Sequence, residues 1–387
     1  MKKCLLMITG AFDSDGGIAA LNRLTISALA EQYSLDILLF AEKETNGTVI
    51  DPRYISNALP IHARAFSGNK MIFVFSAWRA ILFNKYDLIL VDHVNLASSL
   101  APLCWLGLGK YTVWLCGMEV FPPRPDFEGR IGLKYASRRL AISEYTRQNI
   151  EARYPKLSIE VCDLALDPVR HDPSEYLEEY AGAVEMESLD GNRRRLNRRV
   201  VLHVGRMSTF ERFKGQEVLI DAFPIIHKKN PDAQLVLAGK GDDFERLKSR
   251  ALSLPLDVHA NIFMPGFVAD DLLERLYRLC FLFAMPSIGE GFGLVYLEAM
   301  SRGKPCVGAR ADATPCVIRE GETGVLVDDP RSTKQVADSI IWLFEHPESA
   351  KQMGRAGYDL VQAYYLFPHF RERFWAALGM APWSGID

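Results

Sequence analysis

The sequence predicts an α/β protein with two domains, each built on a parallel sheet. Short apolar runs alternate with longer segments of helical periodicity from the first residues to about residue 365. A charged stretch at about residues 169–199 interrupts this alternation once. A chain of 387 residues is also long enough for two domains of ordinary size.

Composition and charge narrow the class of protein. Hydrophobic residues make up 49% of the chain and charged residues 24%, as in soluble globular proteins. The formal net charge of −3 argues against a globally basic nucleic-acid binder. The seven cysteines form no Cys-x-x-Cys pair and stand mostly in apolar runs, which indicates free thiols in a reducing compartment. We therefore expect no nucleic-acid partner and a cytoplasmic location.

Neither a leader nor a membrane span is predicted. The first apolar run is too short for a signal peptide and leads into a glycine loop, so it is predicted to be a strand. The longest nearly uncharged stretch, residues 94–109, is shorter than a membrane span. Peripheral contact of the protein with the inner face of a membrane is an alternative that the sequence leaves open.

Residues 1–168 are predicted to form the first domain. Expected strands are residues 3–9, 34–40, 87–92, 111–116, 140–143 and 158–162, and expected helices include 17–31, 71–83 and 143–153. Alternation of this kind favours a doubly wound parallel sheet, since parallel strands need crossover connections. The aromatic-rich residues 366–387 are expected to form a helix that joins this domain.

Residues 200–365 are predicted to form the second domain. Expected strands are residues 200–204, 234–238, 261–264, 280–285, 305–308 and 324–327, and expected helices include 216–229, 243–251, 270–279, 332–345 and 349–364. Residues 169–199 would be a linker or an insertion. Their arginine cluster, residues 193–199, is interpreted as a solvated face, with a site for acidic lipid or substrate as the alternative.

The stretch from residue 286 to 303 looks least like ordinary packing. It follows an apolar run, contains Gly289, Gly291 and Gly293, and continues as a helical pattern up to Gly303, which suits a left-handed C-cap. The plan is strand, glycine loop, helix, and in a parallel sheet such a loop lies at the ligand-binding carboxyl edge. Glycines let a ligand approach the backbone, and the N–H groups of a helix's first turn favour an anion such as phosphate.

Two carboxylates, Glu290 and Glu298, flank this predicted anion site. They would repel a phosphate but accept hydrogen bonds from hydroxyls, so a polyol next to a phosphate is the natural ligand. A nucleotide sugar has that composition. The alternative is that both are ordinary surface acids near a helix N-terminus.

Two cations are expected at the same edge. Arg206 follows the predicted strand 200–204, and Lys214 precedes the predicted helix 216–229. Together they would neutralise a diphosphate, most strongly as its charge grows on leaving. Each alone would be interpreted as a solvated surface residue.

Other candidates carry weaker signals. Gly16 and Gly17 stand between the first strand and the first helix, and Gly239-Lys-Gly241 and residues 265–268 follow later strands. Ligand contact and plain turn chemistry are both compatible with the last two. Asp13-Ser-Asp15 is interpreted as helix capping rather than as a metal site.

The first domain is predicted to contribute polar residues near its strand ends to the site. They are His93, Cys116, Glu119 and residues 143–146. For His93, a site role and a helix-capping role are both open. His203, within an apolar strand, is expected to be structural.

Several of these segments resemble the family-4 retaining glycosyltransferases. The resemblance rests on Gly-Arg and Lys-Gly within residues 205–215, on Gly239-x-Gly241 and on the Glu-x7-Glu stretch from Glu290 to Glu298. It implies the GT-B fold, two Rossmann-like domains that face each other across a cleft. It also implies retaining transfer of a hexose from a UDP-hexose or GDP-mannose to a saccharide or lipid-linked saccharide. No metal or other cofactor is expected.

The resemblance also implies residue roles. Arg206 and Lys214 would hold the donor diphosphate, Glu290 the transferred sugar and Glu298 the ribose, the first three being the catalytic candidates. Further donor contacts are implied for Gly16, Gly17, Gly205, Gly241, Phe267, Val268, Gly291, Phe292, Gly293, Leu294 and Val295.

One position departs from the family pattern. Many members have His-Gly-x-Glu or His-Gly-x-Asp where this chain has Cys116-Gly-Met-Glu119. His93, Cys116 or Glu119 would then contribute the contact to sugar or acceptor. The departure keeps two alternatives open, a nucleotide-sugar epimerase of the same shape and a nucleotide-sugar-binding protein without turnover.

Several alternative roles are compatible with the aromatic residues of the first domain. Trp78, Phe83, Trp105 and Trp114, together with Arg79, would mostly pack in the core. A sugar platform or a membrane-facing patch is the alternative.

Overall fold

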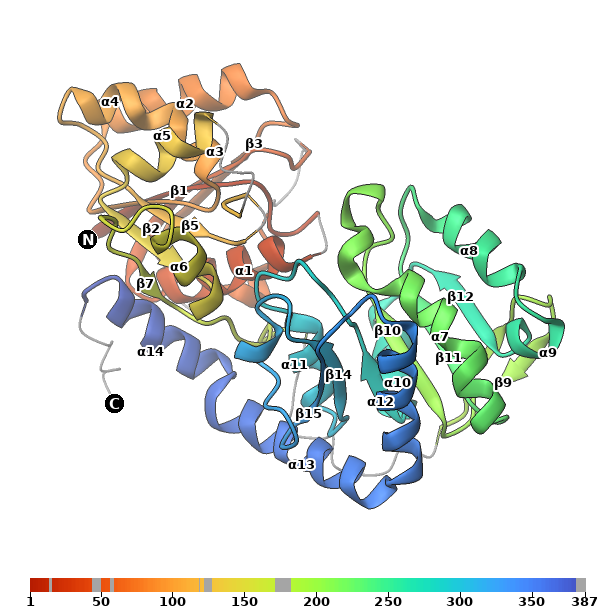
Figure 1. Ribbon diagram of the computed structural model, residues 1–387. Coiled ribbons are helices and arrows are strands. Elements are labelled where there is room, and N and C mark those ends of the chain that lie inside the picture. Colours follow the sequence, from red (N-terminus) through yellow and green to blue (C-terminus); the bar gives the residue numbers. More distant parts are fainter. Residues whose placement is uncertain are drawn as a thin grey trace. The chain divides into compact units, whose positions relative to one another are not determined.

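The computed structural model describes residues 1–13, 16–43, 50–55, 59–117, 119–121, 127–170 and 182–380. The chain divides into two compact units, Met1–Val169 with Leu366–Asp387, and Arg170–Tyr365. Each unit is a parallel sheet flanked by helices, with the second unit additionally carrying a small hairpin (Figure 1). The predicted α/β class is confirmed.

In its described part, the first unit contains a seven-stranded sheet. Its strands are β1 (Lys2–Ile8), β2 (Tyr33–Leu39), β3 (Ile61–Ala65), β4 (Leu88–Val91), β5 (Thr112–Leu115), β6 (Arg138–Ala141) and β7 (Glu160–Val161). They lie in the order β3-β2-β1-β4-β5-β6-β7. Residues 4–8 of β1 are fully buried, as expected for a strand whose sheet is covered on both faces.

The helices of the first unit include one from the far end of the chain. They are α1 (Gly17–Ala30), α2 (Lys70–Phe83), α3 (Val94–Ala97), α4 (Ala101–Trp105), α5 (Phe127–Tyr135), α6 (Glu144–Glu151) and α14 (Phe367–Ala377), with 3-10 turns at Pro52–Tyr54 and Ser98–Leu100. Trp114 stacks on Phe370 and Phe374 of α14, with ring centroids 6.5 and 5.7 Å away. The final part of the expected helix, residues 381–387, lies outside the described residues.

The second unit begins earlier than the sequence suggests. Within the residues 169–199 expected to be a linker or insertion, β8 (Glu185–Glu187) and β9 (Arg193–Arg195) form an antiparallel pair. The turn between them joins the second unit, because Leu189 N donates to Ile262 O at 3.0 Å. Arg193 and Arg195 are exposed, which agrees with a solvated face. Residues 171–181 lie outside the described residues.

The main sheet of the second unit has six strands among the described residues. They are β10 (Val200–Val204), β11 (Gln234–Ala238), β12 (Ile262–Gly266), β13 (Leu282–Ala284), β14 (Cys306–Ala309) and β15 (Gly324–Val327), in the order β12-β11-β10-β13-β14-β15. The helices are α7 (Gln216–Lys229), α8 (Phe244–Leu252), α9 (Leu256–His259), α10 (Asp270–Leu279), α11 (Leu294–Met300), α12 (Thr333–Glu345) and α13 (Pro347–Tyr364). Additional 3-10 turns are Thr209–Lys214 and Thr314–Cys316.

Strand β3 and the 3-10 turn Thr209–Lys214 are among the elements that were not predicted. Strand β3 has the sequence Ile-His-Ala-Arg-Ala, whose alternating exposure suits an edge strand but offers no continuous apolar run. The 3-10 turn Thr209–Lys214 contains no buried residue, so hydrophobic periodicity cannot reveal it.

The strand order creates one switch point in each sheet. The order reverses between β1 and β4 in the first unit, and between β10 and β13 in the second. Open α/β sheets bind ligands outside the carboxyl ends of the strands at such points. The loops there in the second unit, after β10 and β13, are the two that the sequence singles out for Arg206, Lys214 and Glu290.

Candidate functional site

The core of the candidate site is an ion pair at the switch point of the second sheet. Lys214 Nζ lies 3.2 Å from Glu290 Oε1, and the two side chains are only 20% and 14% exposed. Lys214 ends the loop after β10, and Glu290 belongs to the loop after β13. The structure thus brings together two of the three predicted catalytic residues.

The two loops are packed against each other by their backbones. Ile288 N donates to Phe213 O at 3.0 Å. Gly215 has φ of 84°, and a Cβ there would lie 2.7 Å from Pro286 O, so only glycine fits. This close approach holds Lys214, the preceding residue, next to the glycine loop.

Asp312 fixes the backbone of Glu290. Its Oδ2 accepts from Glu290 N at 2.7 Å and its Oδ1 from Thr314 N at 2.9 Å, while Ala313 N donates to Glu290 O at 3.2 Å. Burial raises the pKa of Asp312, which is 3% exposed. Sequence analysis missed this residue, although its position just after β14 follows the same strand-end rule as Arg206.

Glu211 lies between the two predicted cations. One carboxylate oxygen is 3.9 Å from Arg206 Nη1 and the other is 3.9 Å from Lys214 Nζ. The Arg206 side chain is 57% exposed, and that of Glu211 is 26% exposed. Both cations predicted to meet a diphosphate therefore face a carboxylate of their own loop, which the sequence analysis did not identify.

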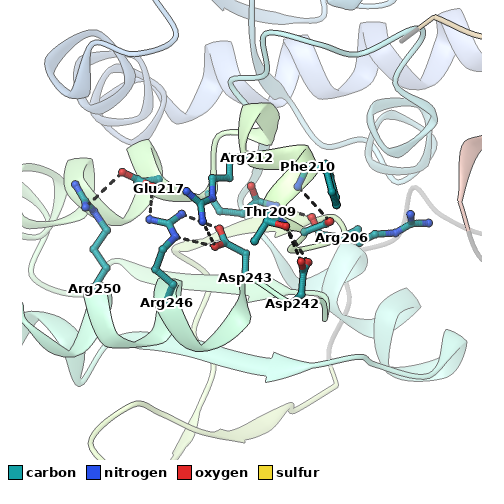
Figure 2. A network of polar contacts seen from close by, with 11 residues as sticks. Arg206, Thr209, Phe210, Arg212, Glu217, Asp242, Asp243, Arg246 and Arg250 are labelled. Atoms are coloured by element: carbon teal, nitrogen blue, oxygen red, sulfur yellow. Dashed lines mark hydrogen bonds and ion pairs between the residues drawn. The ribbon is translucent and has the colours of Figure 1, made fainter. Parts of the chain in front are cut away.

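A polar network anchors this loop to the start of α8 (Figure 2). Asp242 accepts hydrogen bonds from Thr209 N at 3.0 Å and Thr209 Oγ1 at 2.6 Å. Asp243, 3% exposed, accepts from Arg212 at 2.9 Å and from both nitrogens of the Arg246 fork at 2.8 and 2.7 Å. Hydrogen bonds from Arg246 lower the pKa of Asp243 below its usual value.

The network continues away from the site. Arg246 also pairs with Glu217 at 2.6 Å, and Arg250 pairs with Glu217 at 3.3 Å and with Asp221 at 2.7 Å. Figure 2 shows the guanidinium of Arg206 pointing away from these pairs. The loop is thus held through Thr209 and Arg212, while Arg206 projects outward.

The glycines predicted to contact the donor have packing roles as well. A Cβ on Gly241 would lie 2.1 Å from Met207 O, and a Cβ on Gly205 would lie 3.1 Å from His203 Nε2. Gly293 has φ of 97° and precedes α11. Gly303 has φ of 65° at the end of the same segment, which confirms the predicted left-handed cap.

The remaining donor candidates differ in accessibility. Glu298 Oε2 accepts from Tyr277 OH at 2.7 Å, which orients this carboxylate on α11. The Phe267 ring is 55% exposed with Lys240 Nζ 4.7 Å above it, whereas Val268 is buried. Phe292 is 2% exposed and packs edge-on against Tyr365. Gly291, Leu294 and Val295 are half-buried.

His203 is structural, as expected. It is fully buried in β10, and its Nδ1 donates to Ala284 O at 3.0 Å, because a carbonyl can only accept. Burial lowers the pKa of His203 to about 4, and the charge of Lys214 acts in the same direction, whereas the hydrogen bond to Ala284 opposes it.

The candidates of the first unit follow the carboxyl ends of β4 and β5 and are engaged locally. His93 Nδ1 accepts from Asn95 N at 3.1 Å, so the ring caps α3. Glu119 accepts from the backbone N–H groups of Cys116 and Gly117. Burial raises the pKa of the Cys116 thiol well above its usual value, which keeps it protonated at neutral pH.

The first glycine loop is held by buried polar groups that the sequence analysis did not identify. Glu42, 3% exposed, accepts from the N–H groups of Ala11 and Phe12. Asn22 donates to Gly10 O at 2.7 Å and to Asp92 at 2.8 Å.

The end of the same loop begins α1. Gly16 has φ of 135°, and a Cβ on Gly17 would meet nothing within 4 Å. Of the predicted Asp13-Ser-Asp15 turn, Ser14 and Asp15 lie outside the described residues. In the part of the chain that is described, no three His, Cys, Asp or Glu side chains are grouped to hold a metal ion.

Comparison with known proteins finds relatives of the segment that contains Lys214 and Glu290. Residues 186–360 match the family described as glycosyl transferases group 1. A GDP-mannose-dependent alpha-(1-6)-phosphatidylinositol monomannoside mannosyltransferase of Mycobacterium tuberculosis is 32% identical over 230 residues, covering 57% of this chain and 56% of that protein. A D-inositol 3-phosphate glycosyltransferase of Corynebacterium glutamicum is 33% identical over 186 residues, covering 47% and 41%. The chain spans about half the length of these curated relatives.

The fold is shared over nearly the whole chain. Anabaena HepE, solved in complex with UDP, superimposes with a TM-score of 0.73 at 20% identity, covering 97% of this chain and 99% of that one. The chain therefore has the GT-B fold of two Rossmann-like domains, and its residues 186–360 are similar to the glycosyl transferases group 1 family.

Proposed function

We propose that the protein is a retaining glycosyltransferase. It would move a hexose from a UDP-hexose or GDP-mannose to a saccharide or lipid-linked saccharide acceptor. The observation that supports this most is the Lys214–Glu290 pair, 3.2 Å apart at a switch point inside the segment that matches the glycosyl transferases group 1 family. It joins a cation suited to phosphate with a carboxylate suited to hydroxyl groups.

The proposed roles follow from the charges at the site. Lys214 and Arg206 stabilise the diphosphate most as it leaves, because its negative charge is then greatest. Glu290 accepts hydrogen bonds from hydroxyls of the transferred sugar, and Asp312 keeps its backbone in place. Glu298 takes the ribose hydroxyls. With two cations on the diphosphate, the proposal needs no metal.

Retention follows if the acceptor attacks on the face from which the phosphate leaves. The acceptor oxygen forms a bond to the anomeric carbon as the bond from that carbon to the phosphate oxygen breaks. The departing phosphate takes the acceptor's proton, so the step balances without a protein base. This mechanism agrees with the local engagement of His93, Cys116 and Glu119, which leaves their contacts to sugar or acceptor as predictions.

The donor and acceptor classes are supported by the relatives. The mycobacterial relative is named for GDP-mannose and for a phosphatidylinositol acceptor, and the Anabaena structure contains UDP. The proposal therefore includes both UDP-sugars and GDP-sugars as donors. A cytoplasmic location and contact with the inner face of a membrane are part of it as well.

A donor panel tests the proposal directly. UDP- and GDP-sugars are scored for thermal stabilisation and for slow hydrolysis, with and without EDTA, which requires no knowledge of the acceptor. We expect at least one donor to stabilise the chain and to be hydrolysed at an EDTA-independent rate. Isomerisation of a donor without acceptor would instead support an epimerase, and binding without turnover a binding protein.

Glu290→Ala separates transfer from binding. We expect turnover to fall by roughly 100-fold or more, while affinity for the nucleoside diphosphate changes little, since that ligand lacks the sugar. Glu322→Ala is the control, because Glu322 is exposed and pairs with Arg319. Full activity of Glu290→Ala contradicts the assigned role.

A further inference from the structure

The first unit exposes an extended apolar surface. On α2, Met71, Ile72, Phe75, Leu82 and Phe83 are 83%, 47%, 68%, 53% and 79% exposed. At the end of α4, Trp105, Leu106 and Leu108 are 79%, 65% and 43% exposed. We call these eight residues the α2–α4 surface. Large contiguous apolar surfaces are rare on monomeric soluble proteins and mark interaction sites.

The residues on α2 lie on one side of that helix. Positions 71, 75, 79 and 82 repeat at the helical period, and Phe73 and Ala77 point inward, where both are fully buried. The outward stripe of a surface helix is ordinarily polar. Here its only charged member is Arg79, and α2 contains no carboxylate.

The two parts of the surface adjoin each other. The Trp78 indole on α2 donates to Ser99 O at 2.8 Å, just before α4. A Cβ on Gly109 would lie 3.7 Å from Ile81 of α2, so the chain after α4 runs against this helix. Figure 1 shows α2 and α4 next to each other within the first unit. Hence α2 and the segment 105–108 form a common apolar exterior.

Positive charges surround this exterior. Within the continuously described stretch 66–110, the exposed charged side chains are Lys70, Arg79, Lys85, Lys110 and Asp87. Four cations thus accompany one carboxylate within this stretch, and Glu128 of α5 pairs with Lys70 at 3.0 Å. Apolar and aromatic side chains flanked by Lys and Arg suit a bilayer interface with anionic headgroups. A second copy of this surface would bring like charges together, which disfavours a symmetric dimer.

We propose that the α2–α4 surface docks the protein onto a bilayer containing anionic lipid. Its apolar side chains enter the boundary between headgroups and acyl chains, and its cations contact the lipid phosphates. No helix among the described residues is long and apolar enough to cross a membrane, and the proposed mode requires none. The proposal rests on the membrane contact included in the proposed function and specifies its surface and lipid, but it does not require glycosyl transfer itself.

Vesicle flotation of the full chain tests this docking. The probes are vesicles of phosphatidylcholine alone and of phosphatidylcholine with phosphatidylglycerol, each at low and high salt. We expect binding to the anionic vesicles that weakens with salt, and much weaker binding to the neutral ones. Equal binding to both kinds, or to neither, overturns the proposal.

Substitutions locate the binding surface. Phe75→Ser with Phe83→Ser should lower the partition onto anionic vesicles by roughly tenfold or more, since each removes an apolar side chain from the interface. Arg79→Glu should lower it and reduce its salt dependence. The matched control is Ile225→Ser with Leu256→Ser, at exposed apolar positions of the second unit.

Two measurements keep the result interpretable. The thermal midpoint of each variant should stay near that of the wild type, because the replaced side chains are exposed. Sedimentation velocity of the wild type should show a monomer. A dimer that the double variant on α2 dissolves, or vesicle binding that this variant retains in full, overturns the proposal in favour of another occupant.

Discussion

His203 illustrates how one buried residue links stability to pH. Its pKa is about 4 in the folded chain, below the ordinary value of about 6.5, so folding favours the neutral ring. Above pH 6.5 the ring is neutral in both states and its contribution is fully present. Between pH 6.5 and 4 the unfolded chain binds a proton that the folded chain does not, so stability is lost as the pH falls.

We therefore predict that His203→Gln flattens the acid limb of the stability profile. Glutamine can still donate to Ala284 O but does not titrate. The wild type should lose up to about 3 kcal/mol more than the variant between pH 7 and pH 4, measured by urea unfolding. Parallel profiles for the two proteins contradict a lowered pKa at this residue.

Glu211 suggests that the site carries its own counter-charge. Its carboxylate lies 3.9 Å from each predicted diphosphate cation. A diphosphate that binds there competes with this carboxylate for Arg206 and Lys214.

Glu211→Gln should therefore tighten donor binding. Because the pairs are partly exposed, we expect a gain of no more than about fivefold in affinity for UDP or GDP by calorimetry, shrinking at high salt. Weaker nucleotide binding would mean that Glu211 positions the cations rather than competing for them.

At the scale of secondary-structure elements, polar contacts hold one turn of the candidate site in place. The 3-10 turn Thr209–Lys214 has no buried residue, so hydrophobic packing does not hold it. Its position depends on Asp242, on Asp243 and on the tight contact at Gly215. The same network has a distal part, Arg250 with Asp221, that does not touch the turn.

Asp243→Asn should loosen the turn and thereby the donor site. Loss of the charge-assisted hydrogen bonds from Arg212 and Arg246 should cost about 1–2 kcal/mol of stability, because Asp243 is buried but both arginines are partly exposed. Nucleotide affinity should fall by roughly tenfold. In the control Asp221→Asn, a more exposed pair is lost, so stability should change by less than about 1 kcal/mol and affinity not at all. Equal effects of both variants on affinity argue against a positioning role.

At the scale of the whole molecule, the last described helix packs into the first unit. Helix α14 follows the second unit in sequence but contributes Phe370, Phe374 and Trp375, all fully buried, to the first. The stability of the first unit thus depends on residues that are synthesised after the whole second unit.

Phe374→Ala should destabilise the first unit selectively. Loss of a buried phenylalanine that stacks on Trp114 should cost about 3–5 kcal/mol. In calorimetry with hydrogen exchange, exchange should rise in β5, which carries Trp114, while β10 and β13 stay protected. A change confined to the second unit would contradict this placement of α14.

The sequence by itself determined the features that depend on local physics. Alternating apolar runs and helical periods predicted most strands and helices within a few residues. Turn chemistry predicted the cap at Gly303, and strand ends next to glycine loops pointed to Arg206, Lys214 and Glu290. Such signals arise because side-chain periodicity and backbone freedom are properties of short segments.

Only the tertiary structure decided which loops meet. Sheet order places β13 next to β10, more than 70 residues earlier in the chain, and this pairing brings Glu290 to Lys214. The same packing recruited Asp312, Glu211 and Asp243, whose importance lies in what they contact and not in any local pattern. It also separated Trp114, buried under α14, from Phe83 and Trp105, which it left exposed. These outcomes depend on burial and pairing between distant segments, so no window of sequence contains them.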